Sequence, residues 1–241
     1  MELKITKHLV NEIFGFLNEV FGGEELVDGI YFDEEIMDGA LPSDYYIYYN
    51  LKHRLYLTPD DVDLDAGMTK MVLFPPNKNY VIKIPCDGLY RQEDFEYSPI
   101  VSACALSNVI DEEMATYDNV KEWYKDDVNE ILAKVLVPNY FICNYGNIPI
   151  YIQPLIKNFV PSECSSIHHS IIDKIDENNS DFNYEWIDNL INQYGIEKTS
   201  KLLSYLYDDF DDLHSSNYGY LNGNAVIFDY GGYSSEMWDW I

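Results

Sequence analysis

The sequence predicts an α+β protein of two lobes, and three observations lead to this prediction. Strand-like runs come in pairs joined by short turns that contain Asn, Gly or Pro, which indicates antiparallel hairpins. Helical stretches stand between these hairpins and do not alternate one for one with single strands, as they would in a doubly wound sheet. Hydrophobic residues make up 47% of the 241 residues, enough to build a buried core.

The first element is a helix over residues 6–21, because apolar residues recur there at helical spacing and Gly22 and Gly23 can end it. Residues 24–66 are acidic and irregular. We expect residues 1–66 to form an N-terminal extension that begins with this helix.

An N-lobe is expected over residues 67–154. It starts with a hairpin over 69–84, where two β-rich runs flank a Pro/Asn turn. Two helices are predicted over 101–117 and 118–134. A second hairpin follows within 137–155, with its turn at 144–147.

A C-lobe is expected over residues 155–241. The polar Ser/Asn-rich stretch after residue 155 predicts a loop, and helices are predicted over 184–194 and 197–210. A turn at 222–224 then joins a short pair of strands.

The charge excludes one class of ligand. The chain carries 42 acidic and 15 basic residues, for a formal net charge of −27. So few cations cannot line a groove for DNA or RNA, so we expect no direct nucleic-acid binding. Residues 67–100 are locally neutral, with 4 acidic and 4 basic residues, and are therefore the natural place for an anionic ligand.

The composition also sets an expected location. No apolar run of 18 residues occurs, so no membrane-spanning helix is expected, and the charged N-terminal helix differs from a signal peptide. The 4 cysteines form no C-x-x-C pair and fit reduced core thiols better than a zinc site or disulfides. These features predict a cytoplasmic protein without membrane contact.

Three separated pieces could supply a phosphoryl-transfer site, which needs cations or metal ions on the phosphates and a carboxylate that positions the attacking hydroxyl. Lys83 stands in an apolar strand, where its charge needs a partner. Asp212 is followed five residues later by Asn217, and Asp229 follows twelve residues after that, at the end of a predicted strand. Each piece is common alone, and the interpretation depends on their order and spacing.

Together these pieces resemble the protein-kinase-like superfamily, in particular the small kinase-like proteins encoded by bacteriophages. VIKIP at 81–85 resembles the strand with the phosphate-binding lysine, DLHSSN at 212–217 the catalytic loop, and VIFDYGG at 226–232 the strand and metal-binding Asp of the D-F-G motif. The resemblance covers roughly 67–233. It implies a minimal two-lobed fold with an antiparallel sheet in the N-lobe and a mostly helical C-lobe.

The resemblance also implies ATP and Mg²⁺ as cofactors. Asp212 would accept or orient the substrate hydroxyl, although its neighbour Asp211 is an alternative. Asn217 and Asp229 would hold Mg²⁺ that bridges the phosphates.

The remaining roles fall on the N-lobe. Lys83 would contact the α- and β-phosphates and pair with a helical glutamate, either Glu113, our choice, or Glu112. The main chain of Gln153 and Leu155 stands where the family binds adenine.

The sequence departs from the family pattern in three places, one of which is that Phe210 and Asp211 stand where H-R precedes the catalytic Asp in protein kinases. It has no G-x-G-x-x-G loop, so a short turn with Gly67, Thr69 and Lys70 would have to cover the phosphates. Only twelve residues follow Asp229, so we expect a truncated C-lobe without the segment that docks peptide substrates.

Two functions of different classes follow. The first is an ATP- and Mg²⁺-dependent phosphotransferase. The alternative is a catalytically inactive acidic protein that mimics nucleic acid and occupies the groove of a basic host protein of restriction or CRISPR defence, with the acids of 24–66 and 173–212 as its surface. A third interpretation is that the excess of acidic residues only keeps the protein soluble.

Overall fold

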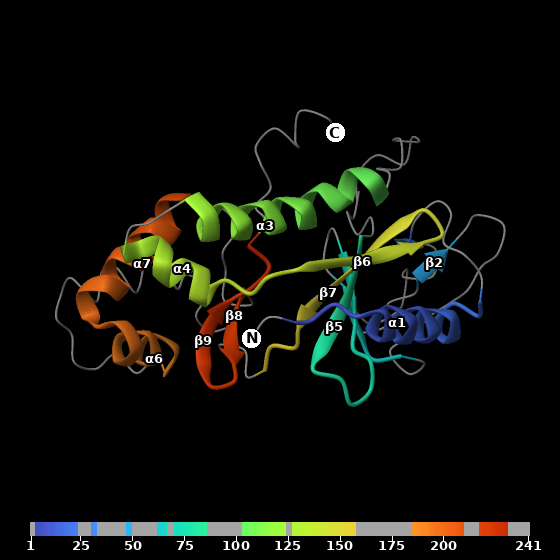
Figure 1. The fold of residues 1–241 in the computed structure, drawn as a ribbon, viewed down its shortest axis with the longest axis horizontal. Coiled ribbons are helices and arrows are strands. Elements are labelled where there is room, and N and C mark those ends of the chain that lie inside the picture. Colours follow the sequence, from blue (N-terminus) through green and yellow to red (C-terminus); the bar gives the residue numbers. More distant parts are fainter. Residues whose placement is uncertain are drawn as a thin grey trace, which may run out of the picture. The chain divides into compact units, whose positions relative to one another are not determined.

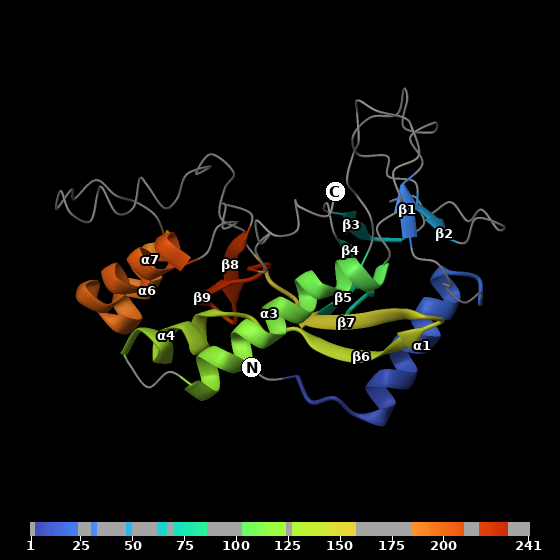
Figure 2. The same cartoon turned by 90° about the horizontal axis from the view of Figure 1, so that it is seen from above.

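The computed structural model describes residues 3–23, 30–32, 47–49, 62–66, 70–85, 103–123, 127–157, 185–209 and 217–230. They form helices and antiparallel strands, so the predicted α+β class is confirmed (Figures 1 and 2). The chain divides into two compact units. The first comprises Met1–Asp111 and Asn139–Pro154, and the second comprises Glu112–Pro138 and Leu155–Ile241.

An antiparallel sheet of five strands forms the centre of the first unit, in the order β3-β4-β5-β7-β6. Its strands are β3 (Leu64–Ala66), β4 (Lys70–Leu73), β5 (Tyr80–Pro85), β6 (Tyr140–Tyr145) and β7 (Ile148–Pro154). After the helices that follow β5, the chain enters the sheet at its edge as β6, and β7 then folds back to lie between β6 and β5. A separate pair joins β1 (Ile30–Phe32) to β2 (Ile47–Tyr49).

Helix α1 (Lys7–Val20) covers the apolar face of this sheet and lies beside β6 in Figure 2. The Thr6 hydroxyl caps its start by accepting a hydrogen bond from the Leu9 N–H. Its apolar stripe is buried among alternate residues of the strands, which point to one face. The members of this core include Ile13, Leu17, Met71, Leu73, Ile82, Ile84, Ile150 and Ile152.

The helices that follow β5 differ from the predicted boundaries. One long helix, α3 (Ala103–Trp123), runs through the position where two helices were expected to meet, and α4 (Asp127–Val135) begins later. Residues 113–122 contain no Gly or Pro, so nothing in the chain stops the helix at residue 117. None of the helices within the described ranges is both long enough and apolar enough to cross a membrane.

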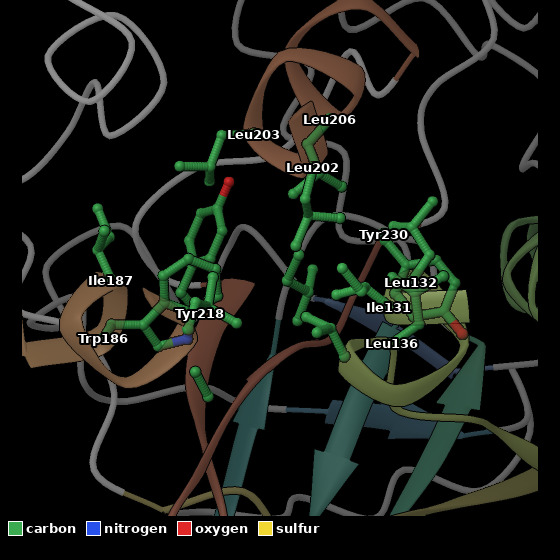
Figure 3. Packing of buried hydrophobic residues seen from close by; sticks show 14 of the residues in the cluster. Ile131, Leu132, Leu136, Trp186, Ile187, Leu202, Leu203, Leu206, Tyr218 and Tyr230 are labelled. Atoms are coloured by element: carbon green, nitrogen blue, oxygen red, sulfur yellow. The ribbon is translucent and has the colours of Figure 1, made fainter. Parts of the chain in front are cut away.

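The second unit packs helices around a hairpin. Helices α6 (Glu185–Tyr194) and α7 (Ile196–Asp209) lie close to their predicted spans, and the hairpin consists of β8 (Tyr218–Leu221) and β9 (Asn224–Ile227). Their apolar side chains form one core (Figure 3). That core includes Ile131, Leu132, Leu136, Trp186, Leu190, Leu202, Leu206, Tyr218 and Tyr230.

Candidate functional site

Lys83 lies in the central strand of the sheet, on the face opposite α1. Its neighbours Ile82 and Ile84 point into the core, so the side chain of Lys83 points the other way. It is only 3% exposed, and its cross-strand partners are Val72 and Tyr151. A buried ammonium on this face requires compensation by polar or anionic groups.

A second cation shares that face. Lys70, which is 6% exposed, stands opposite Pro85 on the neighbouring strand and is therefore diagonal to Lys83. Such diagonal residues lie about 7–8 Å apart, within reach of long side chains. The two ammonium groups can therefore contact the same elongated anion. Thr69, expected beside them, lies outside the described residues.

The start of α3 is tied to the same face of the sheet. The Tyr151 hydroxyl donates a hydrogen bond of 2.8 Å to the Asp111 carboxylate, and Tyr151 directly opposes Lys83 in the strand register. The sequence contains no signal for this contact, because neither residue belongs to a motif. It fixes the part of α3 that immediately precedes the glutamates expected to pair with Lys83.

The two candidate glutamates differ in burial. Glu113 is 0% exposed and shares the buried side of α3 with Val109, Ile110 and Val120. Glu112 is exposed, and partial desolvation raises the pKa of its carboxyl group. A fully buried carboxylate is tolerated only with compensating partners, so its burial favours Glu113 as the residue that takes part in a charged network.

The position expected to bind a base is the end of β7. Gln153 is buried opposite Val81, and Leu155 is half-buried just after the strand. Asp212, the expected catalytic carboxylate, lies outside the described residues, as does its neighbour Asp211.

The β8–β9 hairpin brings Asn217 to Asp229, which are twelve residues apart. Asn222 and Gly223 both have positive φ angles, of 54° and 80°, as a tight hairpin turn requires. Tyr218 then opposes Ile227, which puts the two polar residues at the open end of the hairpin.

The contact between them is direct. The Asn217 Nδ2 donates a hydrogen bond of 2.6 Å to the Asp229 carbonyl oxygen, and the Phe228 N–H donates one of 2.9 Å to the Asn217 carbonyl. A carbonyl oxygen only accepts, so the amide orientation is determined and Oδ1 of Asn217 points away from that carbonyl. We call these two residues the Asn217–Asp229 pair. Asn217 is buried, with 2% of its surface exposed.

Asp229 has a left-handed backbone, with φ of 57°. Non-glycine residues rarely adopt this conformation, and it costs about 1–2 kcal/mol per residue, somewhat less for Asp and Asn. Such strain concentrates at functional sites. Tyr230, the next residue, is buried and donates a hydrogen bond of 3.2 Å to the Val137 carbonyl, which anchors the chain beyond Asp229.

The donor chemistry of the pair fits a magnesium ion shared with phosphates. Among the described residues no group of three or more His, Cys, Asp or Glu side chains could hold a metal ion by itself. Mg²⁺ needs no such cage, because it usually binds through one or two carboxylates and completes its shell with water and substrate phosphates. One carboxylate and one amide oxygen satisfy that requirement.

In comparisons with known proteins, no family model, curated protein or solved structure matches this chain.

Proposed function

We propose that this chain is a minimal kinase-like protein that binds ATP with Mg²⁺ and transfers the γ-phosphoryl group to an acceptor hydroxyl. The single observation that carries the proposal is the contact within the Asn217–Asp229 pair. Two residues that resemble the metal ligands of kinases in spacing and order also meet in space, and Asp229 has a strained backbone.

The sheet of the first unit supports the proposal independently. Protein kinases carry their phosphate-binding lysine on the third strand of the N-lobe and pair it with a glutamate on the helix that follows. Lys83 lies on the third strand of its sheet in chain order, counting β3, β4 and β5. The next helix along the described chain, α3, carries the fully buried Glu113.

Each of these groups would have one role toward the nucleotide. Lys83 and Lys70 supply cations for the phosphates, and the main chain of Gln153 and Leu155 supplies hydrogen bonds for the base. Asn217 and Asp229 supply the oxygen ligands of the metal ion. When bound, Mg²⁺ would neutralise negative charge that develops on the phosphates.

The transfer itself is a displacement at the γ-phosphorus. The acceptor oxygen forms a new bond to that phosphorus, and the bond to the oxygen that bridges the β- and γ-phosphates breaks, so that ADP leaves with the bonding electrons. The hydroxyl proton passes to the Asp212 carboxylate, the role that the resemblance gives to this residue.

The direct test is ATP-dependent thermal stabilisation in the presence of Mg²⁺ or Mn²⁺. We expect the wild type to be stabilised by ATP with metal, and Asp229→Ala to lose the metal-dependent part. Asp118→Ala is the matched control, because Asp118 is exposed on α3 and its replacement changes the net charge equally. The proposal is wrong if Asp118→Ala loses as much metal-dependent stabilisation as Asp229→Ala, or if ATP with metal does not raise the melting temperature of the wild type.

The net charge of −27 supports the acidic mimic as a second candidate. A surface with this density of carboxylates can compete with nucleic acid for a basic groove. Salt-sensitive capture of a purified basic nucleic-acid-binding protein, unchanged in Asp229→Ala, would favour this function over phosphoryl transfer.

A further inference from the structure

Helix α6 contacts both strands of the hairpin that carries the Asn217–Asp229 pair. The Trp186 indole N–H is shared between the carbonyl oxygens of Gly219, at 3.1 Å, and Val226, at 3.2 Å. These two residues oppose each other directly in the strand register. The indole ring also packs edge to face on Tyr218, with 4.8 Å between ring centroids. Figure 3 labels both side chains. One buried side chain therefore links β8 to β9 two residues from Asn217.

A second residue of α6 binds the turn. The Asn189 Nδ2 donates a hydrogen bond of 2.9 Å to the Gly223 carbonyl, and its Oδ1 accepts one of 2.9 Å from the Ala225 N–H. Gln193 donates from its Nε2 to Asn189 Oδ1 at 2.6 Å and to Asn224 Oδ1 at 3.0 Å. Asn189 thus satisfies backbone groups on both sides of the turn.

We infer that Trp186 and Asn189 are positioning residues for the cation site, because they fix the register and tilt of the hairpin that presents Asn217 and Asp229. This inference rests on the proposed function. A two-stranded hairpin alone is marginally stable, whereas a metal site needs its ligands held in one geometry by surrounding hydrogen bonds. These contacts extend from the turn to a rung near the open end, so they can supply that rigidity.

Backbone hydrogen bonds also hold the outer edges of the hairpin. Lys157 exchanges two backbone hydrogen bonds with Tyr220, and Val137 donates one to Ile227. These contacts secure each strand separately to its outer neighbour. The α6 side chains of Trp186 and Asn189 contact both strands or both sides of the turn, which is why we assign the positioning role to them.

The test compares two asparagines of α6. Asn189→Ala removes both hydrogen bonds to the turn, while Asn192→Ala makes the same chemical change on the exposed side of the same helix. For each full-length variant, the affinity for Mn²⁺ is measured by electron paramagnetic resonance with ATP present, and the affinity for ATP is measured separately in EDTA. Loss of groups that orient metal ligands typically weakens metal binding about 10–100-fold.

We expect Asn189→Ala to lose Mn²⁺ affinity in that range while its metal-free ATP affinity stays within about twofold of wild type, and Asn192→Ala to change neither. Trp186→Phe keeps the buried ring but not the N–H, and it should show the same split if Asn189→Ala fails to fold. If the two asparagine variants bind Mn²⁺ with equal affinity, the inference is wrong but the proposed function stands. The same holds if Asn189→Ala loses as much ATP affinity in EDTA as it loses Mn²⁺ affinity. Absence of Mn²⁺ binding in the wild type overturns the inference and the proposed function together.

Discussion

The left-handed backbone of Asp229 predicts that this residue costs folding stability. Two substitutions remove the same carboxylate but treat the backbone differently. Asp229→Ala keeps a side chain at a φ of 57°, where a Cβ atom crowds the following carbonyl, and Asp229→Gly removes that Cβ. The difference between the two variants therefore isolates the backbone strain from the loss of charge.

The magnitude follows from two opposing effects. Removing the Cβ from a left-handed residue relieves about 1–2 kcal/mol. Glycine also has greater conformational entropy in the unfolded chain, which lowers the stability of the folded state by about 0.4–1 kcal/mol. We therefore expect Asp229→Gly to be more stable than Asp229→Ala by about 1 kcal/mol, which corresponds to about 2–4 °C in melting temperature for a chain of this size.

The assay is thermal and urea-induced unfolding of both variants without nucleotide or metal, followed by titration with ATP and Mn²⁺. Both variants should lose metal-dependent ATP binding, because both lack the carboxylate. If the alanine variant is as stable as the glycine variant, or more stable, Asp229 does not have the strained conformation and the argument from strain to function is refuted.

Three further predictions concern the packing around the site and the helix that covers the sheet. Gly219→Ala should destabilise the protein by about 1–3 kcal/mol in urea unfolding, because the new methyl would stand 2.5 Å from Ile156 Cγ2; unchanged stability would contradict this close approach. Thr199→Val should stabilise it by about 1 kcal/mol, since the buried Thr199 hydroxyl has no hydrogen-bond partner within the described part of the chain; a lower denaturation midpoint would show that a partner exists. Glu12 accepts hydrogen bonds from Tyr80, at 2.6 Å, and from Lys78, at 2.9 Å, and both lower the pKa of its carboxyl group. A lowered folded-state pKa contributes stability above the unfolded pKa, so the advantage of wild type over Glu12→Gln should shrink as the pH falls from about 6 to about 3; an advantage that grows on acidification would reverse the assigned sign.

Local signals in the sequence were sufficient for several elements. The spacing of apolar residues predicted α1, and turn residues located the hairpins that became β4–β5, β6–β7 and β8–β9. The contact between Asn217 and Asp229 could be anticipated for the same reason, because a two-residue turn at Asn222 and Gly223 leaves only one register for the strands.

Other features depend on partners far away in the sequence. Strands β1 and β2 have three residues each, too few for a visible alternation, and were missed in a region interpreted as irregular. The position of β7 between β5 and β6 is a non-local pairing that no local pattern specifies. The contacts of Trp186 and Asn189 are made to backbone groups, which every residue possesses, so no sequence motif marks them.

The measurement that tests the central claim most directly is a crystal structure of the full chain grown with a non-hydrolysable ATP analogue and Mn²⁺, recorded at a wavelength where manganese scatters anomalously. Our proposal predicts a manganese peak bonded to oxygens of Asn217 and Asp229 and to phosphate oxygens of the analogue. A bound analogue whose phosphates lie away from Asn217 and Asp229, or manganese on other carboxylates only, would contradict it.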